Sequence, residues 1–308
     1  MSLPETIYHY CSLGTFLNIT GNRTLWLSDI GKSNDSQELK WLKNECRIRI
    51  MKAQNEYLNL HRDDPDITYD YDAMERINRF AEAISTIDLY KSWAICFSEA
   101  RDTLSQWRGY ANDGAGICIG FKREYFDELS HVFDDYETRF LLSMRKVDYS
   151  SEGLDAFFES TTSLNSFDQS KTTDDMNSAL LSAIISTAKN AAYFKSPSFS
   201  EEREWRLAFT DTLLDFGGFE FDKMPRTESG VFSRFVFRKA DCIATGNDII
   251  SHIELWLPEM QDAISEIIIG PKVRMSLDDM KLYLILKGFL KNMNDNSISI
   301  VRSESSYR

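Results

Sequence analysis

The chain has 308 residues, of which 43% are hydrophobic and 13% aromatic, a composition that supports a packed core and argues against disorder. Its net charge of -13 at pH 7 argues against broad, non-specific nucleic-acid binding, although a local basic groove stays compatible with it. Five widely spaced cysteines without a Cys-x-x-Cys pair predict reduced thiols in a cytoplasmic protein, and the four scattered histidines predict no metal site. The chain has no signal-like start and no apolar run of about 20 residues, so no membrane association is expected.

The chain opens with a predicted strand, a short helix and a second strand. Residues 6–10 alternate in character and predict the first strand, with His9 and Tyr10 on opposite sides. Residues 24–27 predict the second strand, which would bring His9 and Ser28 to neighbouring strand ends. The alternative for His9 is a hydrogen-bonded histidine of the core.

Two amphipathic helices are predicted next. Apolar side chains recur at helical spacing over residues 38–60 and again over residues 71–91. We expect the two helices to form an antiparallel hairpin, inserted into the sheet at about residues 36–91, with charged faces in solvent.

The centre of the chain reads as a buried strand over residues 93–98, a short polar helix and a second buried strand over residues 117–121. Asp102 is expected to cap the helix, and Gly116 and Gly120 leave backbone open to a ligand or a neighbouring chain. A well-capped structural corner is the alternative to a binding site here. Six side chains would gather near one strand end: Ser98, Asp102, Gln106, Trp107, Arg108 and Tyr110.

The second half of the chain mixes helices, strands and polar loops. The apolar spacing predicts a helical and loop insertion at about residues 150–195, with at most a short helix near residues 154–159 in its first part. The other elements predicted are helices at 122–132, 177–192, 247–257 and 276–290, strands at 140–149, 231–237 and 263–269, a turn-rich stretch at 211–229 and a last short strand around 298–300.

The segment from residue 198 to residue 209 is the second stretch with candidate chemistry. Period-2 alternation would place Glu202, Glu204 and Arg206 on one face of a strand. Two carboxylates this close raise each other's pKa or need a cation, and Arg206 is the candidate partner. An exposed, charge-balanced edge strand is the alternative.

Strands do not alternate regularly with helices along the chain, and no repeat or long linker divides it. The sequence therefore predicts one α+β domain over residues 1–308, built on a central mixed, mostly antiparallel sheet with helical insertions.

Several short motifs resemble a bacterial family that is catalogued only as a domain of unknown function, number 2971. The family name supplies no activity. The motifs are Tyr8-His9-Tyr10, Leu25-Trp26-Leu27-Ser28, the core from Phe97 to Phe121, Glu202-Arg203-Glu204-Trp205-Arg206 and Ile268-Ile269-Gly270-Pro271.

The placing of polar groups at strand ends is also similar, more distantly, to the ADP-ribosyltransferase fold. This resemblance implies that His9 holds the ribose side of NAD, that Glu204 stabilises an oxocarbenium-like transition state, and that Glu202 orients the acceptor or acts as a base. It implies that Arg108 or Arg206 meets the pyrophosphate. The remaining residues expected to contact NAD are Tyr10, Ser28, Ser98, Trp107 and Tyr110.

We therefore expect an NAD-dependent ADP-ribosyltransferase that acts as a toxin or phage-defence effector on RNA, DNA or protein, with a possible antitoxin partner. One alternative is a metal-dependent nuclease that holds Mg²⁺ through Glu202, Glu204 and either Asp148 or Asp102. Another is a non-enzymatic module that binds a partner through the Trp, Tyr and Arg side chains of the central corner.

Overall fold

A computed structural model describes residues 3–32, 38–63, 71–86, 90–126, 141–163, 184, 187–212, 236–245 and 248–307. The chain forms a mixed α/β structure around an open, ten-stranded sheet. Among the paired strands, only β9 and β10 run parallel, so the largely antiparallel sheet predicted from the sequence is confirmed. Across these residues, no helix combines the length and the apolar character that a membrane crossing requires.

The strands follow the order β10-β9-β4-β1-β3-β2-β8-β7, while β6 pairs with the other edge of β3 and β5 pairs with β6. Nine of the ten form one continuous antiparallel network, in which β3 touches three partners. The strands are β1 (Thr6–Ser12), β2 (Thr24–Asp29), β3 (Tyr90–Ser98), β4 (Gly116–Lys122), β5 (Leu141–Lys146), β6 (Glu204–Thr212), β7 (Val236–Thr245), β8 (Asp248–Trp256), β9 (Ile264–Ile269) and β10 (Ser299–Arg302).

The sheet divides along one edge of β3. The described ladder between β1 and β3 has a single residue pair, Tyr8 with Ser98. At the other end of the same edge, β2 pairs with β3 from Ser28 and Ala94 onward. Residues 95–97 of β3 therefore have no described strand partner on this edge, although β6 pairs with them on the other. This division leaves a gap between β1 and β2.

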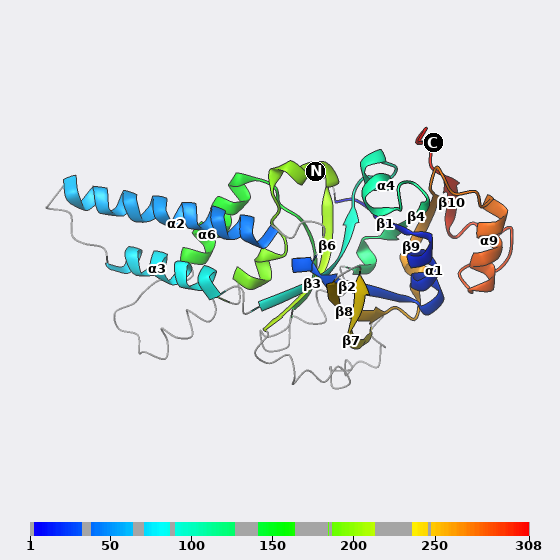
Figure 1. The fold of residues 1–308 in the computed structure, drawn as a ribbon, viewed down its shortest axis with the longest axis horizontal. Helices are drawn as coiled ribbons and strands as arrows, with labels where there is room; N and C mark the ends of the chain where they lie inside the picture. Colours follow the sequence, from blue (N-terminus) through cyan, green and yellow to red (C-terminus); the bar gives the residue numbers. More distant parts are fainter. Residues whose placement is uncertain are drawn as a thin grey trace.

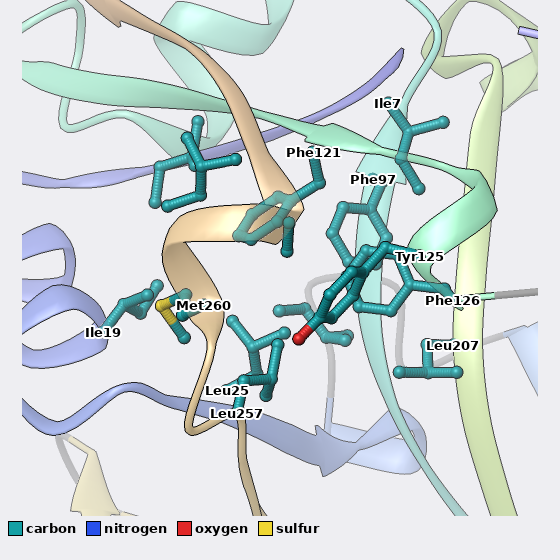
Figure 2. Close-up of a cluster of buried hydrophobic side chains, with 14 of the residues drawn as sticks. Ile7, Ile19, Leu25, Phe97, Phe121, Tyr125, Phe126, Leu207, Leu257 and Met260 are labelled. Atoms are coloured by element: carbon teal, nitrogen blue, oxygen red, sulfur yellow. The ribbon is translucent and has the colours of Figure 1, made fainter. Parts of the chain in front are cut away.

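Aromatic rings fill the layer beneath the gap. Phe97 of β3 lies 5.7 Å from Phe121 and 5.2 Å from Phe126 between ring centroids. Figure 2 shows these rings with Tyr125 beside them and Leu207 of β6 nearby. Because each ring is almost fully buried, this cluster fixes β3, β4 and β6 against one another.

The described helices lie mainly at the two ends of the sheet, with α2, α3 and α6 together at one end and α1 and α9 at the other (Figure 1). The first group has its own apolar cluster, which includes Leu42, Phe80 and Phe157. The helices are α1 (Leu13–Asn22), α2 (Glu38–Asp63), α3 (Tyr71–Thr86), α4 (Leu104–Tyr110), α6 (Ser151–Ser163), α8 (Met260–Ala263) and α9 (Leu277–Leu286), with 3-10 helices η1 (Ile30–Lys32) and η3 (Pro197–Glu202).

Two predictions of secondary structure away from the candidate site are wrong. The stretch 247–257 is expected to be helical, but residues 248–256 form β8, because strands β2 and β7 pair with it on both sides and its isoleucines suit a pleated surface. The stretch expected to be mostly loop after residue 150 begins with α6, whose Leu154 and Phe157 pack against α2 and α3. The predictions over residues 127–132, 164–183, 213–229 and 231–235 lie outside the described residues.

The structure corrects the role of Asp102 and shows which neighbour approaches Gly116. Asp102 does not cap α4: the residue at the cap position is Thr103, and the Asp102 carboxylate instead accepts from the indole N–H of Trp107 at 2.6 Å. Gly116 makes room for the chain itself, since a Cβ there would stand 2.2 Å from the carbonyl oxygen of Cys11.

Candidate functional site

A pocket of about 410 Å³ opens where the sheet divides, a size that suits a small-molecule ligand. Strands β1, β2, β3 and β6 contribute to it, together with α4 and the segment that leads into η3. The lining residues are Tyr8, His9, Tyr10, Trp26, Ser28, Lys32, Ala94, Ile95, Cys96, Phe97, Ser98, Gln106, Tyr110, Lys195, Phe199, Glu202, Glu204 and Arg206.

Eight of the ten residues predicted as site residues line this single pocket. Register explains part of the convergence, because Tyr8 pairs with Ser98 and Ser98 pairs with Glu204. These three residues form one row across three strands, so the Cα atoms of Tyr8 and Glu204 are about 10 Å apart at ordinary strand spacing. The eight are His9, Tyr10, Ser28, Ser98, Tyr110, Glu202, Glu204 and Arg206.

Glu202 does not lie in a strand, contrary to the prediction. It ends η3, and Arg203 follows with a φ of 42°, in the left-handed region. Pro197 favours the 3-10 turn by starting it with a fixed φ. The exposed edge strand considered as an alternative is wrong as well, because β6 pairs on both sides and Glu204 is buried.

Lys195 connects the two carboxylates. Its ammonium donates to Glu202 Oε2 at 2.7 Å and to Glu204 Oε2 at 3.3 Å, and lies 4.7 Å from the centre of the Phe199 ring. The side chain of Lys195 is only 5% exposed. Buried charges need partners of opposite sign, so this lysine and the two acids form one ionic network.

Arg206 holds the other side of Glu204. Its guanidinium donates to Glu204 Oε1 through Nε at 2.8 Å and to Oε2 through Nη2 at 3.1 Å, and Nη1 donates to the carbonyl oxygen of Ala192 at 2.8 Å. Burial alone would raise the pKa of Glu204, but the charge and hydrogen bonds of Arg206 and the charge of Lys195 outweigh it and lower that pKa to about 2. Glu204 is thus a fixed carboxylate at neutral pH.

Glu202 lies nearer the opening than Glu204, since its side chain is 14% exposed and that of Glu204 is 7% exposed. Its Oε1 accepts from the hydroxyl of Tyr110 at 2.7 Å, and its backbone carbonyl accepts from Ser98 Oγ at 2.6 Å. Burial and the charge of Glu202 raise the pKa of Tyr110, so the phenol stays protonated and donates to the carboxylate. Tyr110 of α4 thus fixes the carboxylate of Glu202, and Ser98 of β3 fixes its backbone.

His9 closes the divided edge of β3. Its Nδ1 lies 2.9 Å from the carbonyl oxygen of Cys96, an atom that only accepts, so Nδ1 is the donor. Burial lowers the pKa of His9 from its usual 6.5, and the hydrogen bond to Cys96 offsets part of that effect. The imidazole is therefore neutral at pH 7, which leaves Nε2 as an acceptor. This arrangement matches the hydrogen-bonded histidine considered as an alternative, but the same side chain also lines the pocket.

Trp107 and Arg108 do not line the pocket. Trp107 is fully buried and stacks edge-on against Tyr10, with ring centroids 4.9 Å apart. Arg108 points to the opposite side of α4, where it lies 4.7 Å from the centre of the Tyr307 ring. Of the central corner, the pocket receives Ser98, Gln106 and Tyr110, while the rest supports α4.

Sequence reasoning missed two residues that line the pocket, the cation Lys195 and the aromatic Trp26. Lys195 follows an apolar run with no local pattern to mark it, and only the fold brings it to the acids. Trp26 lies in the Leu25-Trp26-Leu27-Ser28 motif of a predicted strand. Alternation along that strand places it on the face opposite Leu25 and Leu27, which is the signal that could have found it.

The carboxylates considered for Mg²⁺ are engaged elsewhere. Glu202 and Glu204 bind Lys195 and Arg206, Asp102 binds Trp107, and Asp148 accepts from the backbone and hydroxyl of Ser150. Within the described ranges, no three His, Cys, Asp or Glu side chains are arranged to hold a metal ion.

Fold and pocket together define a mixed α/β protein whose largely antiparallel sheet divides around a cleft with a buried ionic network. Residues 106–207 match the model of the family described as protein of unknown function DUF2971, so the resemblance predicted from the motifs is confirmed over this part of the chain. No curated protein and no solved structure matches the chain.

Proposed function

We propose that the protein is an NAD-dependent ADP-ribosyltransferase that modifies a nucleic acid or a protein. The observation that supports it is the convergence of His9 from β1, Ser98 from β3 and Glu204 from β6 on one pocket. A first-strand histidine, a middle-strand serine and a late-strand glutamate around one cleft are what the resemblance to the ADP-ribosyltransferase fold implies.

The chemistry favours these residue types. When the bond between C1′ of the ribose and the pyridinium nitrogen breaks, its electron pair leaves with neutral nicotinamide and positive charge develops on the ribose. A carboxylate that is already ionised and fixed is worth most at that point, because its attraction grows toward the transition state. Glu204 has this character, since Arg206 and Lys195 keep its pKa low and its position constant.

Glu202 acts on the acceptor in this proposal. The acceptor atom forms the new bond to C1′ and loses a proton, which a nearby carboxylate can accept. Glu202 lies closer to the opening and is held by Tyr110 and Lys195, so we assign it the orientation of the acceptor and the removal of that proton. His9 contributes an uncharged hydrogen-bonding ring, which does not compete with the charge on the ribose.

The experiment is incubation with NAD labelled in the adenylate part, with cell extract as the source of acceptor, followed by measurement of both label transfer and nicotinamide release. We expect Glu204→Gln to lower transfer about 100-fold or more, as removal of a transition-state electrostatic group does. The control is Glu201→Gln, which changes the exposed acid immediately before Glu202 and should keep full activity.

Thermal unfolding establishes that each variant is folded, and Glu202→Gln serves as the second variant if Glu204→Gln is not. Unchanged transfer in the folded variants, or no transfer and no nicotinamide release by the intact protein, would sink the proposal. A parallel incubation with Mg²⁺ and RNA or DNA tests the nuclease alternative. For the setting, we propose a toxin or phage-defence effector, so that expression of the intact chain but not of Glu204→Gln arrests growth.

A further inference from the structure

Trp26 forms a flat aromatic platform on the wall of the pocket. Its side chain is 38% exposed and belongs to the pocket lining. One face of the indole stacks on the imidazole of His252, with ring centroids 4.0 Å apart and an angle of 23° between the planes. His252 is only 2% exposed, so it is fixed beneath the indole. The exposed area of Trp26 is therefore its other face and its edge.

The platform stands across β3 from the carboxylates. Strand β2, which carries Trp26, and strand β6, which carries Glu204, pair with opposite edges of β3. Two strand spacings separate them, about 10 Å at the usual distance between neighbouring strands. A ligand that contacts both the indole of Trp26 and the carboxylate of Glu204 must be extended, with a flat ring at a distance from its reacting bond.

A cation lines the pocket on the same side. Lys32 follows β2, and its ammonium lies 2.6 Å from Asp248, with the two side chains 44% and 55% exposed. An exposed ion pair of this kind adds little stability, so its ammonium can exchange the carboxylate for a ligand phosphate. Lys195 and Arg206 differ, because both are buried and bound to Glu204.

We propose that Trp26 is the subsite for the adenine ring of the dinucleotide and that Lys32 contacts the adjoining phosphate. This inference rests on the proposed function, and it adds the residues that recognise the half of NAD that is not expelled. A base stacked on an aromatic side chain typically gains about 5- to 150-fold in affinity. The prior stacking on His252 means that the indole needs no reorientation to receive the base.

The test is calorimetric titration of the full chain with AMP, ADP-ribose and nicotinamide mononucleotide. We expect Trp26→Ala to weaken AMP and ADP-ribose by about 10- to 100-fold, while nicotinamide mononucleotide changes by less than about twofold. Trp26→Phe keeps a stacking ring and should retain most of the affinity. AMP should quench tryptophan fluorescence in the unaltered chain, and this quenching should be lost in Trp26→Phe. Lys32→Gln should weaken AMP and leave adenosine unchanged.

Equal weakening of AMP and nicotinamide mononucleotide in Trp26→Ala, or AMP binding that does not change, overturns the assignment. If AMP binding is unchanged but the KM for the acceptor rises, Trp26 binds the acceptor and the adenine subsite is wrong. Loss of AMP binding in Trp26→Ala, in a protein that releases no nicotinamide from NAD, upholds the subsite and refutes the transferase separately.

Discussion

Replacing Lys195 by methionine tests the ionic network at the base of the pocket. The ammonium binds Glu202 at 2.7 Å and Glu204 at 3.3 Å, so the two carboxylate oxygens are at most about 6 Å apart. Without the lysine, two unit charges at about 6 Å repel by about 3 kcal/mol at an effective dielectric constant of about 20. We expect Lys195→Met to lower the free energy of unfolding by about this amount near pH 7.5, as measured by urea denaturation.

The effect of Lys195→Met should depend on pH. In the unaltered chain the pKa of Glu204 is about 2, below its unfolded value of 4.5, so its contribution is full above pH 4.5 and is lost as the pH falls toward 2. In Lys195→Met, repulsion from Glu202 raises the pKa of Glu204, and protonation of Glu204 relieves that repulsion. The difference in the free energy of unfolding between the variant and the unaltered chain should therefore shrink near pH 5. The control is Lys146→Met, which removes a 51% exposed partner of Glu99 and should change stability by less than about 1 kcal/mol. A loss below about 1 kcal/mol for Lys195→Met, or one that grows as the pH falls, would refute the reasoning.

Three further predictions concern neighbouring parts of the molecule. Gly116→Ala should destabilise by about 1–3 kcal/mol through overpacking, while Gly21→Ala, where a Cβ meets nothing within 4 Å, should not destabilise; urea denaturation compares them. Asp102→Asn should speed proteolysis after residue 302, because the carboxylate binds both Trp107 and the backbone N–H of residue 304. His9 should titrate below 6.5 by NMR, and its contribution to stability should fall as the pH drops from 6.5 toward the folded pKa, a slope that His9→Gln removes.

The parts of the fold that the sequence predicts correctly are those set by local alternation. Residues 93–98 and 117–121 are strands because apolar side chains cover both faces of a central sheet. Trp205, Leu207 and Phe209 alternate into the core as expected. Helix caps are predicted less reliably: Ser276 with Asp279 forms a local capping box at the start of α9, whereas Asp102, the expected cap of α4, binds Trp107 instead.

What the sequence left open depends on partners that are distant along the chain. Ile250, Ile253 and Leu257 fit a helical spacing, while Ile253 and Leu255 also fit a pleated one, and only pairing with β2 and β7 decides for β8. Lys195 has no pattern of its own, because its role depends on two acids that the fold brings to it. The predicted residues of the pocket converge because register places Tyr8, Ser98 and Glu204 in one row, which a single sequence does not reveal.

Because only one described residue pair joins β1 to β3, the width of the cleft can change without disturbing the pairing of the other strands. Among the described residues, β1 contacts this edge of β3 through the pair Tyr8 and Ser98 and through the hydrogen bond from the His9 imidazole to Cys96, whereas β1 with β4 and β3 with β6 form long ladders. Substitutions at the contacts between β1 and β3 can therefore fit the cavity to ligands of different size while the rest of the sheet keeps its hydrogen bonds. Diversification of specificity within this architecture is expected to concentrate there.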